Sequence, residues 1–245
     1  MLAGMRTVLL LHGFTHTGAS WEPVGAALAG RYRVLAPDIR GHGTAGDVEP
    51  VALEAVLDDI STATDGPFTL GGYSMGGRIA LHAALALGPA RVQRLVLVGA
   101  SPGLADPAER AERVVADEAL AARVERMTIA HFADEWATTT PVLAGQPASV
   151  LAAVRADRLR NRPAGLARAL RGLGTGALPS LWDRLGELAM PVTLIVGGRD
   201  GKFQAIAEEM AGSIGAAEVA VIDGAGHAVH LEAPGAVAAT ILRKS

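Results

Sequence analysis

Short runs of apolar residues, each bounded by turn-forming residues, recur along the chain. Runs of this kind are typical of strands that are buried on both faces of a parallel sheet. Helical periodicity lies between most of them, for example over Leu53 to Ala63 and Met75 to Leu87. The alternation predicts a doubly wound α/β fold, with helices on both faces of a mainly parallel sheet. The predicted strands are Thr7 to Leu11, Arg33 to Ala36, Phe68 to Tyr73, Leu95 to Gly99, Val192 to Gly197 and Glu218 to Ile222.

One long segment, 102–186, interrupts this alternation. It has no convincing strand, and its Ala, Arg, Leu and Glu residues recur at helical spacing between scattered prolines. Strand-like runs precede and follow it. The sequence therefore predicts a helical cap at 102–186, inserted into an α/β core that consists of 1–101 and 187–245.

Composition excludes several classes of function. The 245 residues include no cysteine, which rules out disulfides, thiolate catalysis and cysteine-ligated zinc. A net charge of −3 gives no electrostatic reason to expect binding to nucleic acid or to a membrane. We find neither a signal peptide nor an uncharged apolar stretch of about 20 residues, so we expect a cytoplasmic protein. The chain length is compatible with a monomer or a small homo-oligomer.

The pentapeptide Gly72-Tyr73-Ser74-Met75-Gly76 fits the G-x-S-x-G nucleophile elbow. An apolar run precedes it and an amphipathic one follows, as a strand–turn–helix requires. Ser74 would then stand at a helix start, where free N–H groups favour negative charge. The alternative is a glycine-rich turn with an idle serine.

A serine needs a histidine to accept its proton, and that histidine needs a carboxylate to orient it. Asp200 and His227 follow Ser74 in the order Ser, Asp, His, each in a loop after a predicted strand. We therefore predict a catalytic triad of Ser74, Asp200 and His227. Asp223 is a competing carboxylate, although its place directly after a strand favours a turn or a helix cap.

The loop after the first strand, Leu11-His12-Gly13-Phe14, predicts the second part of the machinery. The backbone N–H groups of Phe14 and Met75 are expected to form an oxyanion hole. His12 and His42 are interpreted as structural residues of their turns.

These motifs resemble the α/β-hydrolase superfamily over the whole length of the chain. Narrower motifs are similar to those of the 2-succinyl-6-hydroxy-2,4-cyclohexadiene-1-carboxylate synthases, which are pyruvate-eliminating lyases of menaquinone biosynthesis. Gly198 departs from that family, which often has Glu there. The similar segments are Gly72 to Arg78, Phe132 to Trp136 with Pro141-Val142, Arg158 to Asn161, Gly174 to Trp182 and Asp200 to Phe203.

The resemblance implies a small carboxylated substrate and no metal or organic cofactor. It implies binding roles for five residues, namely Tyr73, Arg78, Arg123, Trp136 and Arg160. Guanidinium groups suit a substrate with three carboxylates, and Arg78 lies one helical turn after Ser74. A serine esterase or carbon–carbon bond hydrolase has the same triad and stays an alternative, as does a binding protein without activity.

Overall fold

The computed structural model describes residues 5–139 and 145–243, and Pro141 and Val142 lie outside them. Six strands form one sheet in the order β2-β1-β3-β4-β5-β6, and every neighbouring pair is parallel. Each observed strand overlaps one that the apolar runs predict, so the predicted α/β fold is confirmed. The strands are β1 (Arg6–Leu11), β2 (Tyr32–Leu35), β3 (Phe68–Tyr73), β4 (Val92–Val98), β5 (Val192–Gly197) and β6 (Ala217–Ile222).

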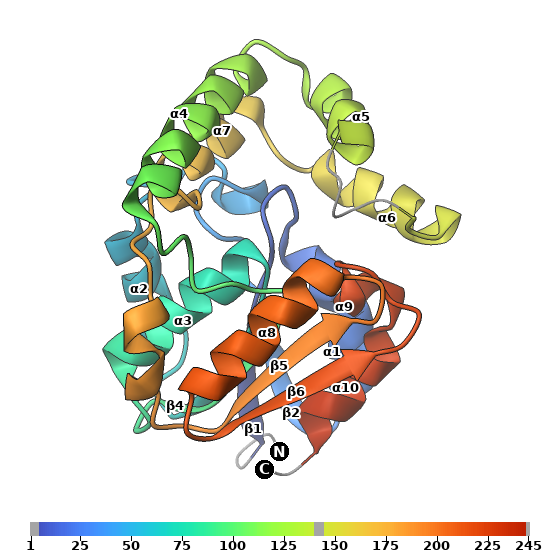
Figure 1. Ribbon diagram of the computed structural model, residues 1–245. Helices are drawn as coiled ribbons and strands as arrows, with labels where there is room; N and C mark the ends of the chain where they lie inside the picture. The colour runs from blue at the N-terminus through green and yellow to red at the C-terminus, as the bar shows by residue number, and fades with distance from the viewer. Residues whose placement is uncertain (1–4, 140–144, 244–245) are drawn as a thin grey trace.

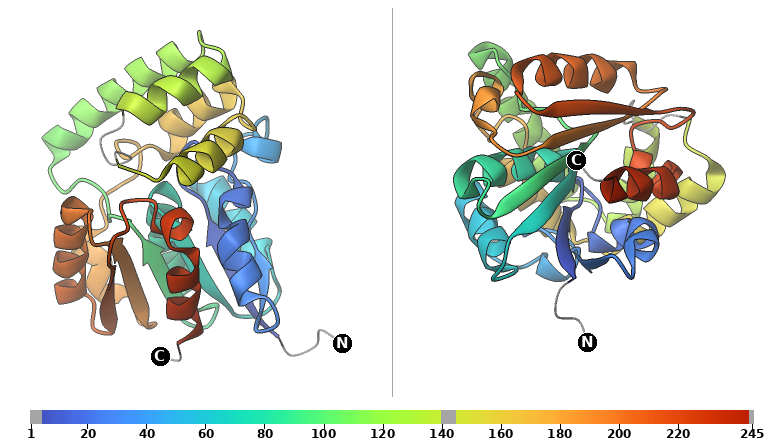
Figure 2. Two further views of the ribbon diagram at one scale, coloured as in Figure 1. Left: turned by 90° about the vertical axis from the view of Figure 1, so that its right-hand side faces the viewer. Right: turned by 90° about the horizontal axis from the view of Figure 1, so that it is seen from below.

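Helices cover both faces of this sheet (Figure 2). Side chains alternate along the strands, so that Leu9 and Leu11 of β1 belong to one buried cluster and Val8 and Leu10 to another. The first cluster includes residues of α2 (Leu53–Thr62), α3 (Met75–Leu87) and α8 (Gly201–Ser213). The second includes residues of α1 (Glu22–Leu28), α9 (Val229–Glu232) and α10 (Pro234–Leu242). Short 3-10 helices lie at Gly18–Trp21 (η1), Gly43–Ala45 (η2) and Trp182–Glu187 (η4).

Four further helices lie beyond the carboxyl ends of the strands (Figure 1). They pack as two pairs, α4 with α7 and α5 with α6. Phe14, from the loop after β1, packs against the apolar clusters of this helical layer and so joins it to the sheet. The helices are α4 (Pro107–Val124), α5 (Ile129–Thr139), α6 (Ala148–Arg158) and α7 (Pro163–Leu173).

The chain enters and leaves the cap along two adjacent segments. The N–H of Leu181 donates to the Pro102 carbonyl at 2.8 Å, and Trp182 Nε1 donates to the Gly103 carbonyl at 3.2 Å. Leu178, Leu181 and Leu185 already belong to the core cluster under the sheet. The chain thus packs with the core from Leu178 onward, ahead of residue 186, where the sequence analysis places the end of the cap.

No helix within the described ranges combines the length and the apolar composition that crossing a membrane requires.

Candidate active site

Ser74 lies in a sharp turn between β3 and α3. Its φ is 51°, a left-handed conformation that is uncommon for a residue other than glycine, and its N–H donates to the Val98 carbonyl at 2.9 Å. Close approach of α3 to β1 requires glycine at position 76, because a Cβ there would lie well under 3.0 Å from backbone atoms of Leu11 and His12. The turn thus places the serine hydroxyl at the start of α3.

His227 connects the serine to Asp200. Its Nδ1 donates to Asp200 Oδ2 at 2.7 Å, and its Nε2 faces Ser74 Oγ at 3.4 Å. Asp200 caps α8, since its other oxygen accepts the Phe203 N–H at 3.4 Å. His227 and Asp200 are both buried, whereas Asp223 is exposed. The three predicted residues therefore come together.

Two backbone N–H groups are available beside the serine. Among the described residues, neither the Phe14 nor the Met75 amide has a hydrogen-bond acceptor. Both residues line the cavity that contains Ser74. They could together donate to an oxyanion that forms on a bound substrate.

His12 fixes the loop that carries Phe14. Its Nδ1 donates to the Gly13 carbonyl at 2.9 Å, and its Nε2 accepts the Ile39 N–H at 2.9 Å. Burial lowers the pKa of His12 to about 4, so the ring is neutral near pH 7. Its geometry is that of a structural residue, and His42 packs edge-on against it.

A cavity of about 670 Å³ lies between the triad and the cap. Its volume falls within the usual range for small-molecule sites. Its described lining contains four cationic side chains and no carboxylate; the cations are Arg78, Arg113, Arg123 and Lys202. The cavity therefore suits an anionic molecule.

Arg78 is the most deeply buried of these cations. It is only 7% exposed, it forms no ion pair within the described residues, and its Nε has no hydrogen-bond partner. Burial lowers its pKa to about 10, which leaves the guanidinium charged near neutral pH. A buried, unpaired guanidinium beside a nucleophile is costly unless a ligand anion binds there.

Arg113 is a cavity residue that the sequence analysis missed. It lies on α4, and its Nε donates to Asp117 Oδ1 at 2.7 Å, one helical turn away. The segment Gly174 to Gly176 crosses α4 at this point, and a Cβ at Gly174 would lie 2.7 Å from Asp117 Oδ2. This crossing accounts for the two glycines there. The i, i+4 spacing of Arg113 and Asp117 on the inner side of α4 is the signal that could have identified it.

Arg123 and Trp136 also line the cavity. Arg123 lies about half exposed, and its Nη1 pairs with Glu135 at 2.6 Å. The ring of Trp136 packs edge-on against Phe14, with centroids 5.4 Å apart. The tryptophan thus covers the residue that carries one of the two free amides.

The expectation that Arg160 reaches this cavity is wrong. Its side chain is 62% exposed, lies 3.8 Å from Asp157, and lines a separate cavity beside η1. The physical reason is that α6 ends at Arg158, so the chain turns away before residue 160.

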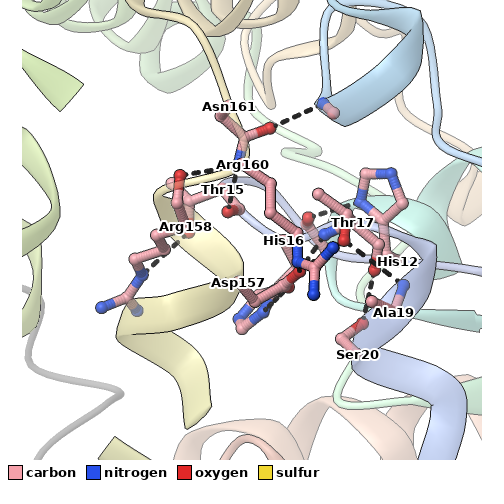
Figure 3. Close-up of polar contacts among 12 residues, drawn as sticks. His12, Thr15, His16, Thr17, Ala19, Ser20, Asp157, Arg158, Arg160 and Asn161 are labelled. Carbon is pink, nitrogen blue, oxygen red and sulfur yellow. Dashed lines mark hydrogen bonds and ion pairs between the residues drawn. The ribbon is translucent and has the colours of Figure 1, made fainter. Parts of the chain in front are cut away.

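Arg158 is the buried arginine of this segment, and its side chain points away from that of Arg160 (Figure 3). Its Nε donates to Thr15 Oγ1 at 3.2 Å, while its buried Nη2 has no partner within the described part of the chain. Burial lowers its pKa to about 10, and the facing Tyr73 opposes this effect.

Tyr73 does not line the cavity above Ser74 as far as its described lining goes. Its buried ring packs against the rings of His227 and His230, with centroid distances of 5.3 and 4.2 Å. Burial raises the pKa of its hydroxyl, against the effect of the nearby Arg158 guanidinium. Tyr73 thus supports the catalytic histidine from behind.

Comparisons with known proteins identify the family. A sequence profile of the alpha/beta hydrolase family matches residues 8–240. A 2-succinyl-6-hydroxy-2,4-cyclohexadiene-1-carboxylate synthase of Salmonella paratyphi C is 36% identical over 239 residues, covering 96% of this chain and 91% of the relative.

Two solved structures are also similar. MenH from S. aureus has a TM-score of 0.90 and 30% identity, over 97% of this chain and 92% of that one. A thermophilic esterase from Thermogutta terrifontis, solved with malate bound, has a TM-score of 0.80 and 30% identity, over 96% and 88%.

Proposed function

Since the chain belongs to the alpha/beta hydrolase family and shares more than a third of its sequence with a 2-succinyl-6-hydroxy-2,4-cyclohexadiene-1-carboxylate synthase, we propose that it catalyses the same reaction. It is an enzyme that acts as a lyase. It eliminates pyruvate from 2-succinyl-5-enolpyruvyl-6-hydroxy-3-cyclohexene-1-carboxylate, in the pathway to menaquinone.

The charge of the cavity is the observation that carries this proposal. The substrate has three carboxylates, and the described cavity lining offers four cations with no acidic side chain. Arg78 has no ion-pair partner within the described residues, so a substrate carboxylate can supply one. An esterase for uncharged esters has no use for a buried guanidinium at that position.

The triad would act as a base. His227 accepts the proton of Ser74, and Asp200 stabilises the resulting imidazolium through Nδ1. The Ser74 oxygen then removes a proton from the carbon next to the succinyl ketone. No acyl-enzyme is needed, because the electron pair left on carbon is held as the enolate of the ketone. When the enolate collapses, the pair moves through the ring double bond and expels the enolpyruvyl oxygen, and the released enolpyruvate takes the proton held by His227 as it becomes pyruvate.

The oxyanion hole and the arginines would share the developing charge. The Phe14 and Met75 amides stabilise the enolate oxygen as they would stabilise a tetrahedral intermediate. Arg78 and Arg113 bind substrate carboxylates within the cavity. Arg158 lies outside the described lining of this cavity, but it is the third candidate because its buried Nη2 lacks a partner among the described residues. The cap above these groups reduces contact with water, which strengthens their interactions.

Ester or carbon–carbon bond hydrolysis is the second candidate. The similarity to the malate-bound T. terrifontis esterase favours it, since that protein is as similar in sequence as the S. aureus structure is. Because the same triad can catalyse both reactions, only a comparison of substrates can distinguish a lyase from a hydrolase.

The deciding experiment measures pyruvate release by purified enzyme from the enolpyruvyl substrate, beside hydrolysis of an uncharged short-chain aryl ester. We expect turnover of the first to exceed that of the second by a factor of about 100 or more in kcat/KM, because only the first uses the cationic cavity. Ester hydrolysis without pyruvate release would refute the lyase.

A further inference from the structure

Two residues other than glycine have a positive φ within residues 5–139 and 145–243, and both lie in the active site. One is Ser74 of the predicted triad. The other is Thr15, with φ of 71°, directly after the oxyanion-hole residue Phe14. A β-branched residue in this conformation is strained and persists only where its surroundings hold it.

Thr15 occupies the third position of a tight turn. The turn is closed by the His16 N–H, which donates to the Gly13 carbonyl at 3.1 Å. A positive φ at the third position defines a type II turn, where glycine or asparagine is the ordinary choice. The Phe14 amide belongs to the same turn, so the position of this amide depends on the turn being held.

Hydrogen bonds from the cap hold this turn in place. Asn161, just beyond α6, donates from Nδ2 to the Thr15 carbonyl at 2.8 Å, and its Oδ1 accepts the Gly43 N–H at 2.9 Å (Figure 3). Its Nδ2 also lies 3.2 Å from the Arg158 carbonyl. One buried amide therefore joins the cap to the loops that follow β1 and β2.

Asp157 and Arg158 hold the same loop on either side of Thr15. Asp157 accepts from His16 Nδ1 at 3.2 Å and from the Thr17 N–H at 3.0 Å, and it also accepts from the Thr17 hydroxyl. Although burial alone opposes ionisation of Asp157, these donors keep its pKa below the ordinary value. Arg158 donates to the Thr15 hydroxyl.

We propose that Asp157, Arg158 and Asn161, which we call the cap clasp, position the oxyanion hole, with Asn161 as the principal positioning residue. The inference rests on the proposed role of the Phe14 amide. It adds a task for the cap beyond binding carboxylates, because the cap fixes a strained turn in the core. If the clasp only stabilised the fold, its hydrogen-bond donors would not need to contact Thr15. They do contact it, and Thr15 is the strained residue next to Phe14.

The test compares Asn161→Ala and the isosteric Asn161→Asp with the native enzyme. Both variants lose the donor to the Thr15 carbonyl, and Asn161→Asp keeps an acceptor for Gly43. We expect kcat to fall about tenfold, less than the 100-fold or more that follows removal of an oxyanion donor. The fall should be similar for pyruvate elimination and for aryl ester hydrolysis, with little change in KM.

A second substitution separates positioning from folding. Thr15→Gly removes the conformational cost of the positive φ, so adding it to Asn161→Ala should recover part of the lost kcat. The matched control is Arg155→Ala on α6, which breaks an exposed ion pair with Asp134 of α5 and should leave kcat unchanged. Thermal melting of every variant reports on folding independently.

The proposed role of the clasp is refuted if kcat of the Asn161 variants stays within twofold of the native value, or if only KM for the carboxylated substrate rises. It is also refuted if Thr15→Gly restores none of the kcat that Asn161→Ala loses. Ester hydrolysis keeps the test independent of the lyase. If the enzyme hydrolyses esters but releases no pyruvate, the proposed lyase function fails. The effect of the Asn161 variants on ester hydrolysis still tests the clasp.

Discussion

At the scale of single residues, substitutions of the cavity arginines test the proposed lyase against an esterase. A bidentate guanidinium cannot be replaced by an ammonium without loss of geometry. Arg78→Lys and Arg113→Lys should therefore lower kcat/KM for pyruvate elimination about tenfold, while aryl ester hydrolysis changes little. Arg160→Lys is the matched control, since this exposed side chain lines a different cavity. Equal loss of both activities would mean that Arg78 and Arg113 serve the fold.

Ser74 carries the second prediction at this scale. Its replacement by alanine removes the only group that the proposed mechanism places between His227 and the substrate, and triad residues act as a unit. Turnover should fall about 10³-fold or more, with the melting temperature nearly unchanged. Pyruvate release by Ser74→Ala at the native rate would remove the serine from the mechanism and leave His227 as the base.

The arginines also show where sequence reasoning ends. Ser74, Asp200 and His227 could be placed because each follows a strand, and parallel strands bring their carboxyl ends to one edge. The cap offered no such constraint, since many arginines lie on its helices at similar spacing. Choosing between Arg158 and Arg160 required knowing that α6 ends at residue 158.

At the scale of elements, the nucleophile elbow depends on a glycine contact between α3 and β1. A Cβ at Gly76 would overlap backbone of Leu11 and His12, which cannot move without disturbing the strand. Gly76→Ala should lower the free energy of unfolding by roughly 3 kcal/mol or more.

A Cβ at Gly212 on α8 would meet no other atom within 4 Å. Gly212→Ala should therefore raise the free energy of unfolding by up to about 1 kcal/mol, because alanine has the higher helix propensity. Urea unfolding of the two variants measures the contrast. An equal effect on both variants would show that helix propensity, rather than the contact with β1, determines the change in the free energy of unfolding.

The elements of the core were predictable and those of the cap were less so, for a physical reason. Strands buried on both faces appear in the sequence as apolar runs, and β3 and β5 begin and end where such runs do. Cap helices bury only part of their surface, so their ends depend on tertiary contacts. The packing of Leu178 and Leu181 into the core is such a contact, and the periodicity of the chain did not reveal it.

At the scale of the whole molecule, buried neutral histidines make stability depend on pH. Burial lowers the pKa of His12 to about 4 and that of His42 to about 3, and the two rings contact each other beneath Phe14. The unfolded chain binds protons at these residues near pH 6.5, whereas the folded chain does not. Stability is therefore full above about pH 6.5 and is lost as the pH falls.

Between pH 6.5 and pH 5 the loss should be about 2 kcal/mol for each of the two histidines. The carboxylates whose pKa the fold lowers, Asp38 and Asp157, do not titrate in this window. Urea unfolding at about pH 7 and about pH 5 measures the difference. His42→Gln should reduce it by about 2 kcal/mol, and the buried His16, His82 and His230, whose pKa values burial also lowers, supply part of the rest. If His42→Gln kept the native pH dependence, the acid sensitivity would have to come from groups outside the His12–His42 pair.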